Sequence, residues 1–416
     1  MKKNRICYIA ISLLLVCTTA INLTGCATKI QAKSLMDGIK PNEVKTLDDL
    51  GSQNVIVTDF AIRLLQATEK SGESTLISPL SVLSALAMTA NGAEEETLKQ
   101  MEAVFGMTRE ELNLYLYSYI KTLSQGDKYK LSLANSIWFT DDESFTVSRD
   151  FLQVNADYYG ADIYETSFNK QTCKDINNWV KQRTNKMIPK ILDQVSSDAV
   201  MYLVNALAFE AEWSDIYLEN QVRAGKFTNQ EGTQRDVEFM YSSEYTYLED
   251  EKATGFMKYY DGGKYAFVAL LPNAGISVSE YIASLDGESL NTLLMNRQSA
   301  SVYTSIPKFK SEYTVDMSQI LNTMGMTDAF DSQKADFGSI ATSGAESIYI
   351  NRILHKAYIS VDERGTKAGA ATVVEVLDGS GPCSINIYLD RPFIYMLIDC
   401  ENNIPFFIGT VMDIQK

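Results

Sequence analysis

The segment Glu363-Arg364-Gly365-Thr366-Lys367-Ala368-Gly369-Ala370-Ala371-Thr372, here called the hinge, separates an apolar stretch from a turn-rich stretch. Small side chains alternate along it, at Thr366, Ala368, Ala370 and Thr372. In an extended chain, residues at period two share one face, and this face could slip between two strands without a steric clash. From these residues alone the hinge is either a flexible Ala/Gly linker, which is the commoner use of such residues, or a strand that can insert into a sheet.

The regions on either side of the hinge predict a mixed fold. The first quarter after Ile56 has helical apolar spacing, alternation predicts a strand over Leu131–Phe139, and Thr172 begins a further helix. Beyond Met201 the apolar runs predict strands, interrupted by one helix around residues 315–324. Helices first and strands later, without regular βαβ alternation, indicate the α+β class rather than a doubly wound sheet.

The hinge resembles the reactive-loop hinge of the serpins, and further segments look like serpin signatures in serpin order. These segments are Leu76–Ser81, Asn135–Trp138, Ile176–Val180, Leu203–Phe209 with Trp213, Ile306–Lys310, Leu321–Met326 with Ala329-Phe330, Ala335–Phe337 and Asp390–Ile394. The resemblance covers about residues 53–416. It implies one α+β domain with the serpin fold, three β-sheets, about eight or nine helices and an exposed reactive loop.

The resemblance implies a suicide-type protease inhibitor and not an enzyme. In that mechanism a protease cleaves the loop and forms an acyl-enzyme, and the cleaved loop inserts into a β-sheet and traps the protease. The implied hinge residues are Glu363, Gly365 as the pivot, Thr366, Ala368, Ala370 and Thr372. The implied polar cluster beneath the opening sheet is Ser78, Ser81, Asn205 and His355, with Trp213 where insertion begins.

The position of the reactive bond follows from two counts that disagree slightly. Counting 17 residues from Glu363 inclusive gives Gly379-Ser380, whereas counting back from Pro392-Phe393 points near Gly381. The residues flanking this bond include Val374, Val376, Leu377 and Asp378. The valines and the leucine suit an elastase-like or subtilisin-like serine protease, or a papain-like cysteine protease. No Arg or Lys lies near the bond to attract trypsin.

Composition and charge narrow the function classes. Apolar residues make up 45% and Pro only 8 residues of 416, which excludes a disordered or collagenous chain. The net charge is −16, and without the first 25 residues, which hold three basic residues and no acid, it is 34 − 53 = −19. Such a body repels phosphate backbones and anionic lipid, and we find no local basic patch, so we expect no nucleic-acid partner.

Few residues could support catalysis or metal binding. His355 is the single histidine, so His-pair zinc sites are excluded, and no GxSxG, GxGxxG or Walker motif is present. We therefore expect no cofactor and no metal. Because His355 lies in an apolar strand, a buried, hydrogen-bonded structural histidine is expected. After residue 26 the cysteines are Cys173, Cys383 and Cys400, and these three thiols predict no disulfide framework.

The amino terminus predicts export. Basic residues precede the apolar run Ile9–Cys17, and Leu23-Thr24-Gly25-Cys26 resembles the lipobox of bacterial lipoproteins, whose cysteine carries acyl chains such as palmitate. An ordinary signal peptide, or a short membrane helix with a chance cysteine, is the alternative, although the run is short for a span. We expect a lipoprotein signal peptide over residues 1–25, lipidation at Cys26, a tether over 26–52 and the serpin domain over 53–416.

We therefore expect a monomer anchored by lipid to the outer side of a bacterial membrane or cell surface. Two other function classes stay open. One is a non-inhibitory protein with the serpin fold that acts as a carrier or chaperone. The other is a lipid-anchored solute-binding protein, which the lipobox and the acidic body alone would suggest.

Overall fold

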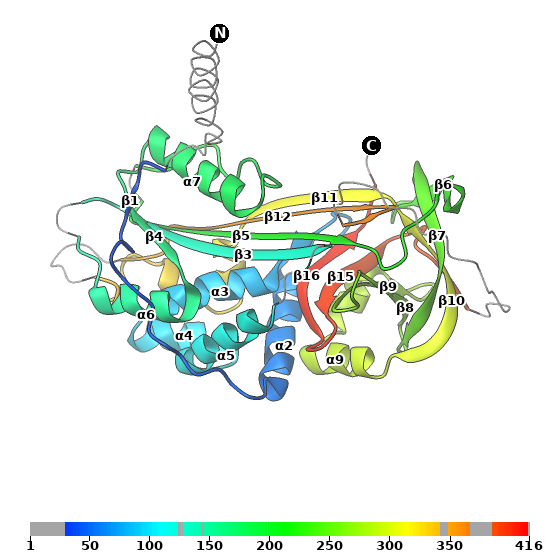
Figure 1. The fold of residues 1–416 in the computed structure, drawn as a ribbon, viewed down its shortest axis with the longest axis horizontal. Helices are drawn as coiled ribbons and strands as arrows, with labels where there is room; N and C mark the ends of the chain where they lie inside the picture. The colour runs from blue at the N-terminus through cyan, green and yellow to red at the C-terminus, as the bar shows by residue number, and fades with distance from the viewer. Residues whose placement is uncertain are drawn as a thin grey trace, which may run out of the picture.

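The computed structural model describes residues 30–123, 126, 128–142, 145–197, 199–341, 348–366 and 385–414. In this part of the chain a long sheet carries most helices on one face and a single helix, α7, on the other (Figure 1). The α-helices are α2 (Gly51–Thr68), α3 (Pro79–Ala90), α4 (Glu95–Phe105), α5 (Arg109–Thr122), α6 (Arg149–Tyr159), α7 (Lys170–Arg183), α8 (Val278–Ala283), α9 (Gly287–Met295) and α10 (Ser318–Thr323).

The described strands form two hydrogen-bonded networks. The first has seven strands in the order β1 (Lys33–Ser34), β4 (Asp162–Glu165), β3 (Tyr129–Phe139), β5 (Met201–Glu212), β13 (Gly365–Thr366), β12 (Arg352–Asp362) and β11 (Phe309–Asp316). The second runs β14 (Ile385–Tyr388), β10 (Gln298–Pro307), β7 (Gln234–Glu249), β8 (Ala253–Tyr259), β9 (Tyr265–Pro272), β15 (Phe393–Asp399), β16 (Ile404–Val411) and β2 (Leu76–Ile77), with β6 (Val222–Thr228) on β7.

The second network has two parts that share the long strands β7 and β10. The register between β10 and β7 shifts between Ser299 and Val302, which marks a bulge where the sheet changes direction. Strands β6 and β14 lie on one side of this bulge, and β8, β9, β15, β16 and β2 lie on the other. The resemblance implied three sheets; among the described residues the strands form two hydrogen-bonded networks, because the parts of the second are joined through β7 and β10.

Helix α3 forms the centre of the core. Pro79 starts the helix at a position where its missing N–H is not needed, and all twelve residues of α3 are buried. It lies beneath β3 and β5 on the face opposite α7 (Figure 1). A helix that is buried all round is enclosed by other elements, and here the long sheet covers one side of it.

The α+β fold class is confirmed, but one expectation about the second half is wrong. Besides α10, the described residues beyond Met201 contain α8 and α9. Each begins at a capping box, made by Ser277 with Glu280 in α8 and by Asp286 with Ser289 in α9. These helices have six and nine residues. In segments this short, the apolar spacing of a helix cannot be distinguished from that of a buried strand.

The first described residues lie on the domain surface. Strand β1 pairs antiparallel with β4, and the Asp175 carboxylate accepts hydrogen bonds from the backbone N–H groups of Gln31 and Ala32, at 2.9 and 3.0 Å. The Asp157 carboxylate accepts another from the Asn42 backbone N–H at 2.7 Å. From residue 30 onward, the segment expected to be a tether is therefore attached to the domain surface. Its contacts use mainly backbone groups, which leave no periodic side-chain pattern in the sequence.

Candidate functional site: the hinge and the sheet beneath it

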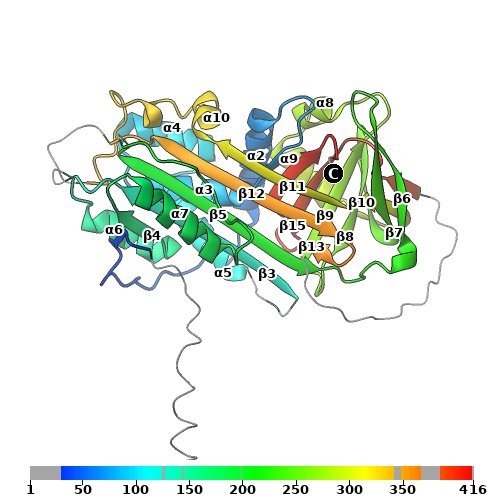
Figure 2. The same cartoon turned by 90° about the horizontal axis from the view of Figure 1, so that it is seen from above.

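The start of the hinge lies inside the seven-stranded sheet. Lower in the sheet, β12 and β5 pair directly and in parallel, from Arg352 opposite Tyr202 to Lys356 opposite Ala206. Higher up, β13 lies between them, with Thr366 opposite Val361 on one side and Ala211 on the other. Neighbouring strands are about 4.8 Å apart. The distance between β5 and β12 therefore grows from one strand spacing, where they pair directly, to two, where β13 lies between them. Figure 2 shows β13 at this end of the sheet.

Gly365 occupies a position that only glycine fits. Its φ is 151°, and a Cβ at this residue would lie 2.0 Å from the carbonyl oxygen of Ala211 and 2.9 Å from the Cα of Glu212. A residue with a side chain could not approach β5 this closely. The structure therefore gives the expected pivot a steric reason.

Thr366 is buried and bound to the second sheet. Its Oγ1 lies 2.6 Å from the Oη of Tyr260, and the Tyr260 ring stacks on Trp213 with centroids 4.4 Å apart. Burial raises the pKa of the Tyr260 phenol, so this group stays neutral. The first inward side chain of the hinge is thus already seated.

Trp213 and its neighbours hold the turn that leads into the hinge. The Trp213 indole Nε1 donates to the carbonyl oxygen of Asp362 at 2.9 Å, and its backbone N–H donates to that of Arg364 at 2.8 Å. The backbone N–H of Tyr217 donates to the Glu363 carbonyl, also at 2.8 Å. Trp213 therefore lies beside the turn that leads into β13.

Glu363 is fixed by an ion pair. Its carboxylate lies 3.0 Å from Lys308 Nζ, which also contacts Glu238 at 3.2 Å. Burial works against the charged form of Glu363, but hydrogen bonds from its own backbone and from Lys308 leave the pKa of Glu363 below its ordinary value. Burial likewise opposes the charge on Lys308, yet the two carboxylates raise the pKa of Lys308.

A second ion pair lies buried below Trp213. Lys258 Nζ is 2.9 Å from Glu244 and faces the rings of Tyr217 and Trp213, 4.4 and 5.5 Å from their centroids. Burial alone would lower the pKa of Lys258, but Glu244 and Tyr217 raise it. A buried pair of this kind fixes the rings on which the hinge rests.

The predicted polar cluster forms a row across three strands. His355 Nδ1 lies 3.0 Å from Asn205 Oδ1, and Asn205 Nδ2 donates to Asn135 Oδ1 at 3.0 Å. The backbone N–H of Ser78, which precedes α3, donates to His355 Nε2 at 3.2 Å, so Nδ1 carries the ring proton. Burial lowers the pKa of His355 to about 3, so the imidazole is neutral.

The two serines join this cluster less directly than expected. Ser78 reaches His355 only through its backbone, and Ser81 lies buried on α3. The hydroxyls of Ser78 and Ser81 make no hydrogen bond to a protein group that the structure describes. The row that links β3, β5 and β12 is therefore Asn135, Asn205 and His355.

The remaining predicted site residues lie outside the described residues. They are Cys26, Ala368, Ala370, Thr372, Val376, Leu377, Asp378, Gly379, Ser380 and Gly381. The described chain resumes at Ile385 in β14.

Sequence patterns pointed neither to three residues that contact the hinge nor to the ion pair beside Trp213. They are Tyr260, Tyr217, Lys308 and the pair Lys258 and Glu244. Lys308 and Asn135 stand inside segments already noted as serpin-like, which could have pointed to them. Tyr260 carries no such signal, because only the pairing of distant strands brings it to Thr366.

Among the residues that can be described, no three His, Cys, Asp or Glu side chains gather as a metal site, and Cys173 and Cys400 are free thiols. None of the helices seen in this part of the chain has the length and apolar character needed to span a membrane.

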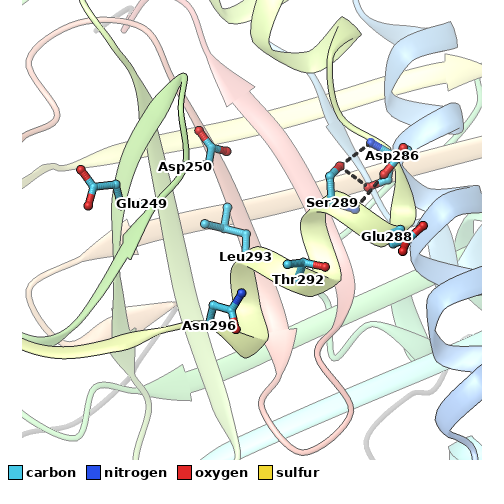
Figure 3. Close-up of a pocket in the computed structure, with 8 residues that line it drawn as sticks. All are labelled: Glu249, Asp250, Asp286, Glu288, Ser289, Thr292, Leu293 and Asn296. Atoms are coloured by element: carbon cyan, nitrogen blue, oxygen red, sulfur yellow. Dashed lines mark hydrogen bonds between the residues drawn. The ribbon is translucent and has the colours of Figure 1, made fainter.

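A pocket of about 420 Å³ lies beside α9 (Figure 3). Two of its four carboxylates have protein partners: Asp286 caps α9 through the Ser289 N–H, and Asp250 accepts from the Tyr281 hydroxyl. None of the residues that line the pocket belongs to the hinge.

Comparison with known proteins decides the family. The family model described as "Serpin (serine protease inhibitor)" matches residues 56–414. The chain belongs to the serpin family. Among curated serpins, the leukocyte elastase inhibitor of Equus caballus is 29% identical over 358 residues, covering 82% of this chain and 93% of that protein. The Homo sapiens protein of the same name is 29% identical, covering 87% of this chain and 99% of its own.

Two solved structures of a thermophilic serpin, tengpin, are similar to this serpin. The native-state structure is 47% identical with a TM-score of 0.89, covering 92% of this chain and all of that one. The latent-state structure is 45% identical with a TM-score of 0.79, covering 90% and 100%. The TM-score is higher for the native-state structure.

Proposed function

We propose that this serpin traps a protease as a covalent acyl-enzyme by inserting its cleaved reactive loop between β5 and β12. One observation carries the proposal: Gly365 and Thr366 already form a short strand that pairs with β5 on one side and β12 on the other. Below them only the direct pairing of the two strands would have to open. Further inward residues of the hinge are small, so they could follow Thr366 without a clash.

The proposed target is an elastase-like or subtilisin-like serine protease, or a papain-like cysteine protease. Val374, Val376 and Leu377, close to the proposed bond Gly379-Ser380, suit their apolar binding pockets. The names of two relatives, both called leukocyte elastase inhibitor, favour the elastase-like class. The family assignment leaves no support for the solute-binding alternative. The experiment must therefore distinguish an inhibitory serpin from a non-inhibitory one.

The experiment compares Thr366→Arg with the conservative Thr366→Ser. An arginine at this position would bring an uncompensated charge between packed strands, costing several kcal/mol. Because deacylation of the protease competes with insertion, Thr366→Arg should still be cleaved but should release active protease. Wild type and Thr366→Ser should give a complex that survives denaturing electrophoresis.

Pancreatic elastase, subtilisin and papain serve as the three probes, with residual protease activity read beside each gel. Unchanged inhibition by Thr366→Arg contradicts the insertion mechanism. Absence of any wild-type complex with all three proteases makes a non-inhibitory serpin the better account.

We also propose that the protein is a bacterial lipoprotein anchored through Cys26. The support is the basic and apolar leader followed by Leu23-Thr24-Gly25-Cys26. Cys26→Ala should abolish acylation and move the protein from the membrane fraction to the soluble fraction. Recovery of a leader-cleaved Cys26→Ala protein in the membrane fraction at the wild-type level would contradict the anchor.

A further inference from the structure

Helix α7 presents a row of lysines directly away from the sheet. Lys170, Lys174 and Lys181 are exposed, and at 3.6 residues per turn they lie within about 40° of one another around the helix. The buried residues of α7, among them Trp179 and Val180, face the opposite way and pack on β3 and β5. We call these three residues the lysine stripe.

The lysine stripe is a basic patch on an acidic protein. Residues 170–190 hold six basic side chains and one acidic side chain, Asp175, a local charge of 6 − 1 = +5 in a chain of −16. Arg183 and Lys190 have carboxylate partners, Asp162 and Asp193. In the part of the chain that the structure describes, no carboxylate is within ion-pairing distance of the three stripe lysines. The expectation that the chain lacks a basic patch is therefore wrong at α7.

The described amino terminus lies against this same helix. Ile30 and Ala32 pack on the apolar cluster that α7 forms with the sheet, and Asp175 of α7 binds the backbone of Gln31 and Ala32. Cys26 is four residues before Ile30, a reach of at most about 14 Å for an extended chain. An acyl group on Cys26 would therefore enter a bilayer close to α7.

We propose that the lysine stripe binds the headgroups of anionic phospholipids and so determines which face of the domain lies on the membrane. The proposal rests on the lipid anchor proposed above. The anchor brings α7 near the surface, and the stripe offers unpaired positive charge on a body that, at −19 without the leader, is repelled overall. In Figure 2, β13 lies along the sheet from α7, towards β7 and β10, so α7 does not cover it and the hinge would stay open to a protease.

The test uses the full lipidated protein on vesicles. One set contains about 30 mol% phosphatidylglycerol in phosphatidylcholine, and the other contains phosphatidylcholine alone. A membrane-impermeant reagent acetylates lysine amines, and peptide mass spectrometry measures the rate at each lysine. Lys99 on α4 and Lys121 on α5, on the other face of the sheet, are internal controls.

The stripe lysines should be acetylated at least about threefold more slowly on the anionic vesicles, and about 1 M NaCl should remove this protection because it shortens the Debye length to about 3 Å. Lys99 and Lys121 should react equally on both. A triple variant, Lys170→Glu/Lys174→Glu/Lys181→Glu, should also lose protection at the neighbouring Lys186 and Lys190. The matched variant Lys99→Glu/Lys121→Glu/Lys252→Glu changes the net charge by the same amount. It should keep the protection at Lys186 and Lys190.

Each contrary outcome identifies the part that fails. Equal acetylation of the stripe on both kinds of vesicle overturns the headgroup contact, even if the protein floats with them. Failure to float with phosphatidylcholine vesicles contradicts the anchor, and the proposal falls with it. Protease trapping, measured on the same samples, reports the inhibitory function separately.

Discussion

The hydroxyl oxygen of Tyr260 lies 2.6 Å from that of Thr366, although 106 residues separate them in the chain. Tyr260 follows β8 of the second sheet, whereas Thr366 lies between two strands of the first. The Tyr260 ring also stacks on Trp213, and the Trp213 indole donates a hydrogen bond to the Asp362 carbonyl in the turn before the hinge. One hydrogen bond and one aromatic pair therefore tie the seated hinge to both sheets.

Removing the Tyr260 hydroxyl tests this tie. Tyr260→Phe keeps the ring on Trp213 but leaves the buried Thr366 hydroxyl without this partner, which should cost about 1 kcal/mol. Amide hydrogen exchange at Thr366 should become faster, because the hinge leaves the sheet more often. As a control, Tyr281→Phe removes a bond to Asp250 and should leave exchange at Thr366 unchanged. Unaltered exchange in Tyr260→Phe would show that this bond does not hold the hinge.

A methyl group at Gly365 should push the hinge out of the sheet. The added Cβ meets the Ala211 carbonyl oxygen at 2.0 Å, and the φ of 151° is also unfavourable for alanine, so Gly365→Ala should cost about 1–3 kcal/mol. Gly263→Ala is the matched control, because Gly263 also has a positive φ but no atom within 4 Å of the added Cβ. Amide exchange at Thr366 should rise in the first variant only. Equal exchange in the two variants would contradict the steric role of Gly365.

His355 should make stability depend on pH. Its pKa is about 3 in the folded protein and about 6.5 when unfolded, so between these values the unfolded chain binds one more proton. The contribution is complete above about pH 6.5 and is lost as the pH falls towards 3, at up to about 1.4 kcal/mol per pH unit. His355→Gln should lack this component, as urea unfolding at pH 8 and pH 5 would show.

The same prediction has a direct spectroscopic readout. His355 is the chain's single histidine, so its imidazole proton resonance is resolved in the folded protein. It should not titrate between pH 8 and about pH 5. A midpoint near 6.5 in the folded state would mean that the ring is not buried as described.

Asp175 should hold the first described residues on α7. Asp175→Ala removes the acceptor of two backbone N–H groups and should cost about 1–3 kcal/mol. Trypsin should then cut after Lys33 faster than in the wild type, because β1 leaves the sheet edge more readily. Asp193→Ala, which removes an exposed carboxylate, serves as the control and should not change this rate. Equal cleavage in all three proteins would contradict the role of Asp175.

Sequence patterns predicted the parts of the site that are local in the chain. Period-two small residues left an insertable strand open beside a flexible linker, and only the resemblance decided between them. The apolar strand around His355 predicted a buried, hydrogen-bonded histidine, which the structure has. The contacts of Tyr260 and Lys308 with the hinge could not be predicted from spacing, because they depend on how two sheets pack. The lysine stripe was overlooked because the net charge averages over the whole chain, whereas helical geometry gathers Lys170, Lys174 and Lys181 on one face.

The five residue pairs that join β12 directly to β5 are the contacts that must separate before the cleaved loop can insert between these strands. Tengpin is a serpin solved in both a native and a latent state, so for that chain two folded arrangements exist. Where a barrier separates two folded arrangements of one chain, the durability of the first is a half-life rather than an equilibrium constant. A melting temperature taken at one scan rate would then say little about how long a stored sample keeps inhibiting. Loss of inhibition with time at fixed temperature is the quantity to follow.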